Sequence, residues 1–484
     1  MRAAEREALA QGKLARLGLL DGPGIEAALD LLDRVHAEGF ETIRVLFPDQ
    51  HGILRGKAVV AEALRSVLAN GMNVPSTLLL KDTSGRTVFP VWSEDGDTPM
   101  RGAGDVLLAP DPASFRPLPW APHSAWLLCD PCQRDGAAIP FAPRPLLAEA
   151  VARLEARGMR MVAGLEVEFQ VFALDTPRVA HADTTMPPRP PATSALAPGY
   201  QFLTEALYDR LEPLMDRLRR TAAGLGLAVR STEVEMGPGQ FEFTFAPDAP
   251  LAQADALVMF RTMVKEVCAR EGLHATFMSR PRLDNAAASG WHLHQSLVDR
   301  DSGRNLFTPD PGQEMTDLAA RWIAGLLAHA RASCLLTTPT VNGYKRYQPF
   351  QLAPDRIAWG HDNRGAMIRA LMEPGDPASR IENRVAEPAA NPYYVFAAQI
   401  AAGLAGIDGA LPLPPRTEAP YATGAQSLPT NLGAAIEAFA SSAVLRAAFG
   451  DGVVDYLAHL KRAEWDRYLS ALSDWEQAEY FSLY

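Results

Sequence analysis

Three stretches that lie far apart in the chain place ionic side chains two residues apart: Glu166-Val-Glu168, His292-Leu-His294 and Arg380-Ile-Glu382-Asn-Arg384. Each stretch has an extended, apolar-flanked pattern, and residues i and i+2 of a β-strand point to the same face of a sheet. Buried charges must be paired with other groups or must coordinate them. The spacing therefore predicts a cavity that holds metal ions and the phosphates of a polyanionic ligand.

A further segment repeats this carboxylate pattern. Glu242 alternates with phenylalanines, and the turn Gly237-Pro-Gly239 is predicted to bring Glu235 back beside it. Side-by-side carboxylates repel one another unless a cation or a proton lies between them. Oxygen ligands with one imidazole suit Mg²⁺ or Mn²⁺. For the strand of Glu166 and Glu168, a solvent-facing edge strand is the alternative.

Arginines form the third group of chemically informative residues. Asn342-Gly-Tyr-Lys-Arg346 and the segment from Arg364 to Arg369 supply guanidiniums, which bind carboxylates and phosphates in bidentate fashion. The chain has neither a P-loop nor the signature motifs of a protein kinase. Many carboxylates and arginines without a nucleophile motif favour metal-assisted phosphoryl transfer from a nucleotide.

The elements that must position these residues mix helices and strands without a strict βαβ order, which predicts an α+β fold. Helical spacing covers residues 4–38, and strands are expected at 42–47 and 53–60. Helices are predicted at 143–158, 203–225, 252–270, 315–333 and 393–406, and from Leu432 onwards. We expect a helical extension at 1–38, a small domain at 39–138 and a catalytic domain at 139–484.

Composition narrows the class of protein. The 484 residues carry a net charge of −11, which argues against a nucleic-acid-binding surface. The chain contains no run of about 18 apolar residues, so no membrane span is predicted. The charged N-terminus does not resemble a signal peptide. Four cysteines make no disulfide framework. A cytoplasmic protein is therefore expected.

Six motifs, in the same order along the chain, resemble those of the glutamine synthetase family: Gly164-Leu-Glu-Val-Glu-Phe169, Glu235-Met-Gly-Pro-Gly-Gln-Phe-Glu242, Ser289-Gly-Trp-His-Leu-His-Gln-Ser296, Asn342-Gly-Tyr-Lys-Arg346, Asn363-Arg364 with Arg369, and Arg380-Ile-Glu-Asn-Arg384 with Asn391-Pro-Tyr393. The similarity runs from about Phe47 to the C-terminus. It implies a small β-grasp N-terminal domain and a catalytic domain with a curved antiparallel sheet and helices. It also implies a homo-oligomer of stacked rings, a dodecamer, with active sites between subunits.

The resemblance also implies the role of each residue. One metal would be held by Glu168, Glu235 and Glu242, and a second by Glu166, His292 and Glu382. The ATP site would contain His294, Ser296, Arg369 and Arg380. Arg364 resembles the arginine that steadies the transferred phosphate, and Asp49 resembles a catalytic aspartate contributed across the subunit interface. Glutamate would be held by Arg346, Arg384 and Gly290. Two or more Mg²⁺ or Mn²⁺ ions and ATP as co-substrate follow from the same resemblance.

Three positions depart from the family pattern. Leu352 stands where ammonia-using members carry a glutamate, and leucine has no charge to attract ammonium and no lone pair to take its proton. Ala287-Ala288 replaces the usual Asn-Gly, and Gln426 replaces the tyrosine of adenylylated members. Leu352, with Trp291 beside the metal histidine, predicts an alkyl or aryl amine as acceptor and a γ-glutamylamide as product.

Two alternatives to this ligase remain open. The first is a glutamine synthetase that uses ammonia through another carboxylate. The second is a catalytically silent structural homologue, against which the six filled metal-ligand positions argue.

Overall fold

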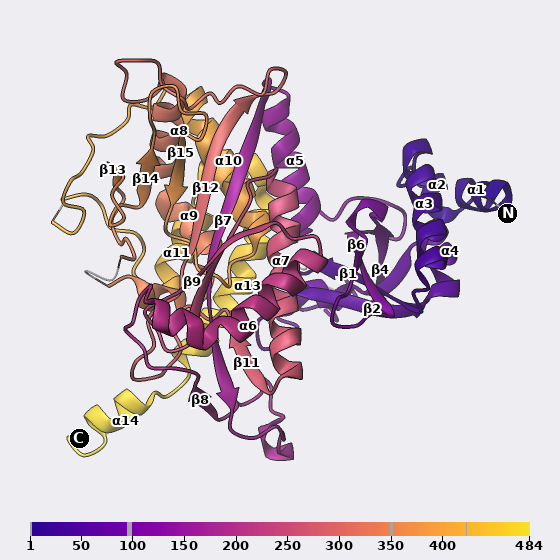
Figure 1. Ribbon diagram of the computed structural model, residues 1–484, viewed down its shortest axis with the longest axis horizontal. Helices are drawn as coiled ribbons and strands as arrows, with labels where there is room; N and C mark the ends of the chain where they lie inside the picture. The colour runs from indigo at the N-terminus through magenta and orange to yellow at the C-terminus, as the bar shows by residue number, and fades with distance from the viewer. Residues whose placement is uncertain (1, 94–98, 349–351, 423) are drawn as a thin grey trace.

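The computed structural model describes residues 2–93, 99–348, 352–422 and 424–484. Its N-terminal part is a small sheet with strand order β2-β1-β6-β4-β3, and β5 pairs with β6. Its elements are α1 (Arg2–Ala10), α2 (Lys13–Arg16), α3 (Gly22–Glu38), β1 (Thr42–Pro48), β2 (Leu54–Val60), α4 (Leu64–Asn70), β3 (Met72–Pro75), β4 (Asp105–Pro110), β5 (Arg116–Pro117) and β6 (Ser124–Cys132). The four helices lie on the outer side of this sheet, remote from the rest of the molecule (Figure 1).

The larger part is built on one nine-stranded sheet with the order β13-β14-β15-β12-β7-β10-β9, while β8 and β11 also pair with β7. Its strands are β7 (Met159–Leu174), β8 (Thr193–Ala195), β9 (Val229–Val234), β10 (Gln240–Phe245), β11 (Leu273–Thr276), β12 (Trp291–Asp299), β13 (Trp359–His361), β14 (Ile368–Leu371) and β15 (Arg380–Asn383). All its strand pairs are antiparallel except β13 with β14.

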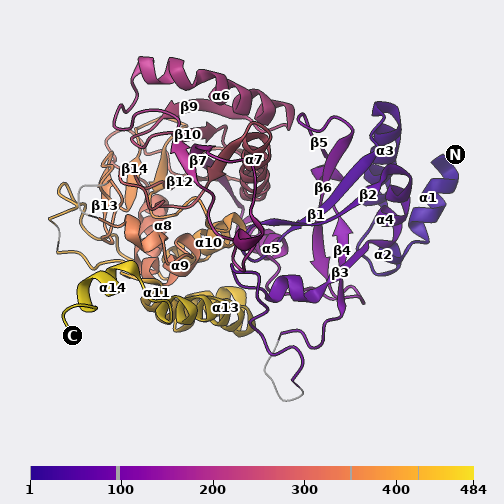
Figure 2. The same cartoon turned by 90° about the horizontal axis from the view of Figure 1, so that it is seen from below.

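Helices pack around this sheet (Figures 1 and 2). They are α5 (Pro143–Glu155), α6 (Glu205–Gly224), α7 (Pro250–Arg270), α8 (Asp317–Ala328), α9 (Ala330–Thr337), α10 (Pro392–Asp408), α11 (Leu432–Ala440), α12 (Ala443–Phe449), α13 (Asp451–Leu469) and α14 (Asp474–Tyr480). Helix α10 is apolar nearly all round and packs against α5, α7 and α8, which makes it the centre of the helical layer.

The central strand β7 divides its residues between two environments. Leu165, Val167 and Phe169 are fully buried, and the ring of Phe169 lies 5.6 Å from that of Phe243 and 5.7 Å from that of Phe260. Because alternate residues point to opposite faces, Glu166 and Glu168 lie on the other side of the sheet. β7 is bonded to β12 on one side and to β10 on the other, so the edge-strand alternative is wrong.

Arg144, at the start of α5, joins the two parts of the chain. Its guanidinium lies 2.6 Å from Asp111 and 3.1 Å from Asp130, both in the N-terminal part, and 3.1 Å from Asp255 of α7. Burial would lower the pKa of Arg144, but Asp130 and Asp255 raise it well above its usual value. One nearly buried cation thus holds three carboxylates at the junction.

The α+β class and the architecture of a small β domain beside a large sheet-and-helix domain are confirmed. Two details differ from expectation. The helix predicted at 315–333 is two helices, because His329 leaves the helical conformation between α8 and α9, and the large sheet is mixed, not purely antiparallel. The predicted domain boundaries stay a prediction.

The C-terminal segment stands apart from the body of the molecule (Figures 1 and 2). Helix α14 has no buried residue, and the exposed fractions of Trp475, Phe481 and Tyr484 are 62%, 76% and 97%. Among the described residues, no single helix is long and apolar enough to cross a membrane; α11 and α12 reach the required length only as a pair bent by 68°.

Candidate active site

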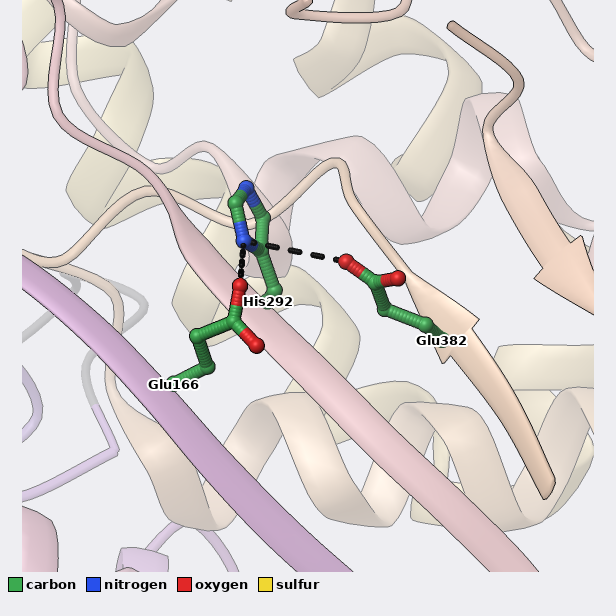
Figure 3. Close-up of side chains that lie close together, drawn as sticks. All are labelled: Glu166, His292 and Glu382. Atoms are coloured by element: carbon green, nitrogen blue, oxygen red, sulfur yellow. Dashed lines mark hydrogen bonds and ion pairs between the residues drawn. The ribbon is translucent and has the colours of Figure 1, made fainter. Parts of the chain in front are cut away.

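The register of the large sheet brings the three ionic stretches side by side. Glu166 of β7 pairs directly with His292 of β12, and Glu168 pairs with Glu242 of β10. His294 of β12 pairs in turn with Glu382 of β15. Side chains of directly opposed residues lie within contact distance on one face. Four strands therefore build one polar floor, part of which is drawn in Figure 3.

His292 lies in the middle of this floor (Figure 3). Its Nδ1 is 2.6 Å from Oε1 of Glu166 and 3.7 Å from Oε1 of Glu382, and its Nε2 is 3.8 Å from Oε1 of Glu168. Three overlapping groups have ligand atoms within 4.8 Å of one another: Glu166, His292 and Glu382; Glu168, Glu242 and His292; Glu233, Glu235 and Glu242.

All six predicted metal ligands are thus brought together, and Glu233 joins them. Glu233 was not among the predicted ligands, although its i, i+2 spacing from Glu235 repeats the pattern of Glu166 and Glu168. The first group reproduces one of the two expected ligand sets. The other expected set is divided between two groups that share Glu242.

At one end of the floor, the carboxylates repel one another more strongly than the cations of the described residues compensate. Burial and the charge of Glu168 raise the pKa of Glu235 to about 8. Burial and the charges of Glu166 and Glu168 raise the pKa of Glu242 to about 11. Such a set of buried, mutually repelling oxygens with one imidazole, and without thiolates, fits a hard divalent cation such as Mg²⁺ or Mn²⁺.

The opposite end of the floor is compensated by imidazoles and arginines. Burial would raise the pKa of Glu166, but hydrogen bonds with His292 and His294 hold it well below its usual value. Glu382 is fully buried, and Arg369 Nη1 donates to its Oε2 at 3.0 Å. Burial acts to raise the pKa of Glu382, yet His292 and Arg384 lower it. This end keeps its negative charge without an added cation.

The tautomer of His294 follows from its two neighbours. Arg380 Nε donates to Nδ1 of His294 at 3.2 Å, and an arginine can only donate. The proton of a neutral His294 ring is therefore on Nε2, which donates to Oε2 of Glu166 at 3.0 Å.

A cavity of about 570 Å³ opens beside these residues. Its lining contains the four residues expected to bind ATP together with the predicted catalytic arginine: His294, Ser296, Arg369, Arg380 and Arg364. Glu166 and Arg230 also line it. Arg364 is exposed, whereas Arg369 is held by Asp362 at 2.6 Å and by Glu382. The cavity has the size and the cationic lining that a nucleoside triphosphate requires.

Two buried arginines occupy the predicted glutamate site. Arg346 donates to the carbonyls of Arg384 and Val385, each at 3.0 Å, and burial lowers its pKa. Nη1 of Arg384 bonds to Glu382, while its buried Nε has no hydrogen-bond partner among the described residues. Gly290 is required here, because a Cβ would lie 2.4 Å from Nη2 of Arg346.

The loop at Ala287-Ala288, where the family usually has Asn-Gly, is held by glutamines of the sheet. Gln170 Nε2 donates to the carbonyl of Ala287 at 2.8 Å. Gln240 Nε2 donates to Oε2 of Glu168 at 2.8 Å and to the carbonyl of Ala288 at 3.3 Å. The loop is therefore anchored to the carboxylate floor without the family's usual side chains.

Leu352, the predicted acceptor-site residue, is half exposed at 52% and has a left-handed backbone with φ of 51°. Its amide donates to Oη of Tyr421 at 3.1 Å, a contact that no sequence motif indicated.

Trp291 is a correction. Its position beside the metal histidine predicted, together with Leu352, an apolar amine, but Trp291 is fully buried and its ring lies 5.8 Å from that of Phe396. It precedes His292 on β12 and therefore points to the opposite face of the sheet.

Asp49 does not join the floor. Its side chain is fully buried at the end of β1, where Oδ1 accepts from the amides of His51 and Ile53 and Oδ2 from Arg55 Nε at 2.5 Å. Its carbonyl accepts from Asn391 at the start of α10. In its own chain, Asp49 therefore holds the turn that connects β1 with β2.

Comparisons with known proteins agree with this geometry. Residues 140–480 match the model of the glutamine synthetase catalytic domain. The chain is 37% identical to gamma-glutamylanilide synthase of an Acinetobacter species, over 95% of this chain and 96% of the relative. It is 36% identical to gamma-glutamylethanolamide synthetase GlnA4 of Streptomyces coelicolor, over 94% and 98%.

A solved structure described as GmaS without ligand superimposes with a TM-score of 0.78 at 30% identity, over 93% of this chain and 99% of the other. The family match covers the whole carboxylate floor and the arginine-lined cavity. This protein belongs to the glutamine synthetase family of ATP-dependent carbon–nitrogen ligases.

Proposed function

We propose that this protein joins an organic amine, alkyl or aryl, to the γ-carboxylate of glutamate at the expense of ATP. Its relatives include enzymes named for γ-glutamylanilide and γ-glutamylethanolamide, two different amine products. The γ-carboxylate would take the terminal phosphoryl group of ATP, giving γ-glutamyl phosphate and ADP. The amine nitrogen would then displace phosphate and release a proton, which balances the reaction.

The residues of the floor have distinct tasks in this reaction. Mg²⁺ or Mn²⁺, two or more per site and held by Glu166, Glu168, Glu235, Glu242, His292 and Glu382, would neutralise the phosphates of ATP. His294, Ser296, Arg369 and Arg380 would bind the nucleotide in the cavity that they line. Arg364, which is exposed and lines the same cavity, would steady the phosphate in transfer.

Glutamate would lie against Arg346, Arg384 and Gly290. The buried Nε of Arg384 supports this assignment, since a buried donor needs an acceptor and a substrate carboxylate supplies one. Holding the γ-carboxylate against the bound phosphate makes the reaction effectively intramolecular. Exclusion of water is equally necessary, because an acyl phosphate hydrolyses.

The single observation that carries the choice of acceptor is Leu352. An apolar, half-exposed side chain occupies the position of the family's ammonium-binding glutamate. Asp355 is the candidate for an alternative carboxylate, but Arg356 lies 3.5 Å from it and offsets its charge. An ammonia-using glutamine synthetase is the second candidate function. In such an enzyme Asp355 would have to bind the ammonium ion and accept its proton.

Phosphate release with ATP, Mg²⁺ and glutamate tests the proposal, with ammonia compared against methylamine, isopropylamine, aniline and a polyamine. We expect an organic amine to give the highest kcat/KM; a highest value with ammonia refutes the proposal. Leu352→Glu is expected to raise ammonia use, and Leu352→Met is the matched apolar control. Asp355→Asn should leave the amine reaction intact, whereas loss of an ammonia reaction would support the second candidate.

We further propose a homo-oligomer of stacked rings, a dodecamer, in which Asp49 contributes to a neighbouring site. The exposed apolar tail from Leu472 to Tyr484 supports association, because large exposed apolar surfaces mark interfaces. Asp49→Asn and Arg364→Lys subunits, each inactive alone, would complement one another in mixed oligomers. A 1:1 mixture is expected to recover about a quarter of the sites if each site takes one residue from each subunit. No recovery would place Asp49 outside the neighbour's site.

A further inference from the structure

Tyr421 lies between two segments that carry predicted site residues, at Leu352 and at Arg364-Gly365. Its hydroxyl accepts the amide proton of Leu352 at 3.1 Å. A Cβ built on Gly365, the residue after Arg364, would lie 3.2 Å from Cε2 of the Tyr421 ring. Burial raises the pKa of Tyr421, while the hydrogen bond from the Leu352 amide and the charge of Arg384 lower it. The hydroxyl of this half-buried residue therefore contacts Leu352, and its ring lies beside the residue that follows Arg364.

The backbone of Leu352 makes the hydroxyl contact consequential. A φ of 51° is unfavourable for leucine, whose Cβ approaches the following carbonyl in the left-handed region. Such conformations persist where surrounding contacts hold them, and they cluster at functional sites. The hydrogen bond from the Leu352 amide to the Tyr421 hydroxyl is one such contact. It would hold the leucine backbone, and with it the direction of the leucine side chain.

We propose that Tyr421 is a specificity-determining residue for the amine: its hydroxyl positions Leu352, and its ring and the Leu352 side chain together form the apolar wall that receives the organic part of the acceptor. This inference rests on the proposed function, because an ammonia acceptor would have no organic part to contact. It concerns a different step from ATP and glutamate binding. Tyr421 sets which amine reaches the acyl phosphate.

The wall explains how one position can select among amines. Removing the aromatic ring widens the subsite, and one methylene in an apolar pocket already changes selectivity by about 10- to 200-fold. Removing only the hydroxyl keeps the ring but frees the amide of Leu352. The two changes therefore have separate signatures, one in the order of preferred amines and the other in the KM of every amine.

The experiment uses the full-length protein with Tyr421→Phe and Tyr421→Ala. For each, kcat and KM are measured for ATP, glutamate, methylamine, isopropylamine and aniline. We expect Tyr421→Ala to change the ratio of kcat/KM for aniline to that for methylamine by about tenfold or more in favour of aniline. Tyr421→Phe should raise the KM of all amines about threefold or more, with the KM values of ATP and glutamate within twofold of wild type.

Tyr456→Phe is the matched control, because it removes one tyrosine hydroxyl bond, to the carbonyl of Leu79, without touching Leu352. It should leave the amine preference unchanged. Phosphate released per amide formed gives a second readout: a misplaced acceptor leaves more acyl phosphate to water, so the ratio should rise in the Tyr421 variants only.

The outcomes separate the two proposals. If the wild type prefers an organic amine but both Tyr421 variants keep its order and KM values within twofold, this inference is overturned and the proposed function stands. If the wild type prefers ammonia, the proposed function fails and this inference fails with it. Should Tyr421→Ala not fold, as judged by its thermal transition, the KM pattern of Tyr421→Phe decides.

Discussion

Glu242→Gln is expected to stabilise the metal-free protein while it abolishes metal-dependent turnover. Glu242 is nearly buried and faces Glu166 and Glu168 across the floor. A glutamine keeps the shape of the side chain and removes its charge. The substitution therefore separates the stability cost of the site from its function.

The magnitude follows from the pKa of Glu242. Burial and the two neighbouring carboxylates raise it from 4.5 to about 11. In the folded, metal-free state Glu242 keeps a proton at pH 7 that the unfolded chain releases, so folding is penalised above pH 4.5. The penalty grows by about 1.4 kcal/mol per pH unit and is on the order of 3 kcal/mol at pH 7. For a chain of this length that corresponds to roughly 3 °C in Tm.

The assay is thermal unfolding from pH 5 to pH 8 in EDTA and in Mg²⁺. In EDTA the Tm of Glu242→Gln should exceed that of the wild type, with a margin that widens as the pH rises; in Mg²⁺ only the wild type should gain strongly. Glu382→Gln is the control of opposite sign. Burial tends to raise its pKa, but His292 and Arg384 hold it below the usual value, so its charge stabilises the fold at neutral pH and glutamine should lower Tm. A Glu242→Gln variant no more stable than wild type in EDTA at pH 7.5 would refute the reasoning.

Three further predictions concern metal, domain and tail. Metal ions must displace the protons of Glu235 and Glu242, so the affinity for Mg²⁺ or Mn²⁺ is expected to rise between about pH 6 and pH 8. Calorimetry in two buffers counts the protons released on binding, and a pH-independent affinity would contradict this prediction. Arg144→Met leaves three carboxylates without their cation, so we expect a loss of about 3–5 kcal/mol and faster proteolysis before α5, and unchanged cleavage would count against it. Removing residues 470–484 deletes the exposed apolar tail and is expected to give smaller assemblies by light scattering, whereas an unchanged mass would exclude the tail from the interface.

Local spacing was enough to predict which residues share a face. The i, i+2 pairs on β7 and β12 needed only the two-residue period of a strand, and the turn before Gln240 needed only its glycines. The same period implies that Trp291 points away from His292. The prediction for Trp291 was wrong because residues adjacent in a strand lie on opposite faces of the sheet. The fold class followed from the mixture of patterns.

Long-range register and charge balance could not be read from the sequence. The direct pairing of Glu168 with Glu242 joins residues of different segments, and no local pattern specifies it. The division of the floor into a compensated and an uncompensated end depends on which arginines reach Glu382. Tyr421 belongs to none of the motifs, and only the folded chain shows that it contacts Leu352.

Strand β7 also sets which changes of chain length the protein can tolerate. It bonds to β8, β10, β11 and β12, and it carries Glu166 and Glu168 on one face and the aromatic core on the other. Inserting a single residue before Glu166 would turn both carboxylates into the core and phenylalanine toward the polar face of the sheet. Leu352 and Tyr421 lie outside any strand or helix, where insertions are tolerated. These loops can therefore change in length during evolution, whereas strand β7 can change only by substitution.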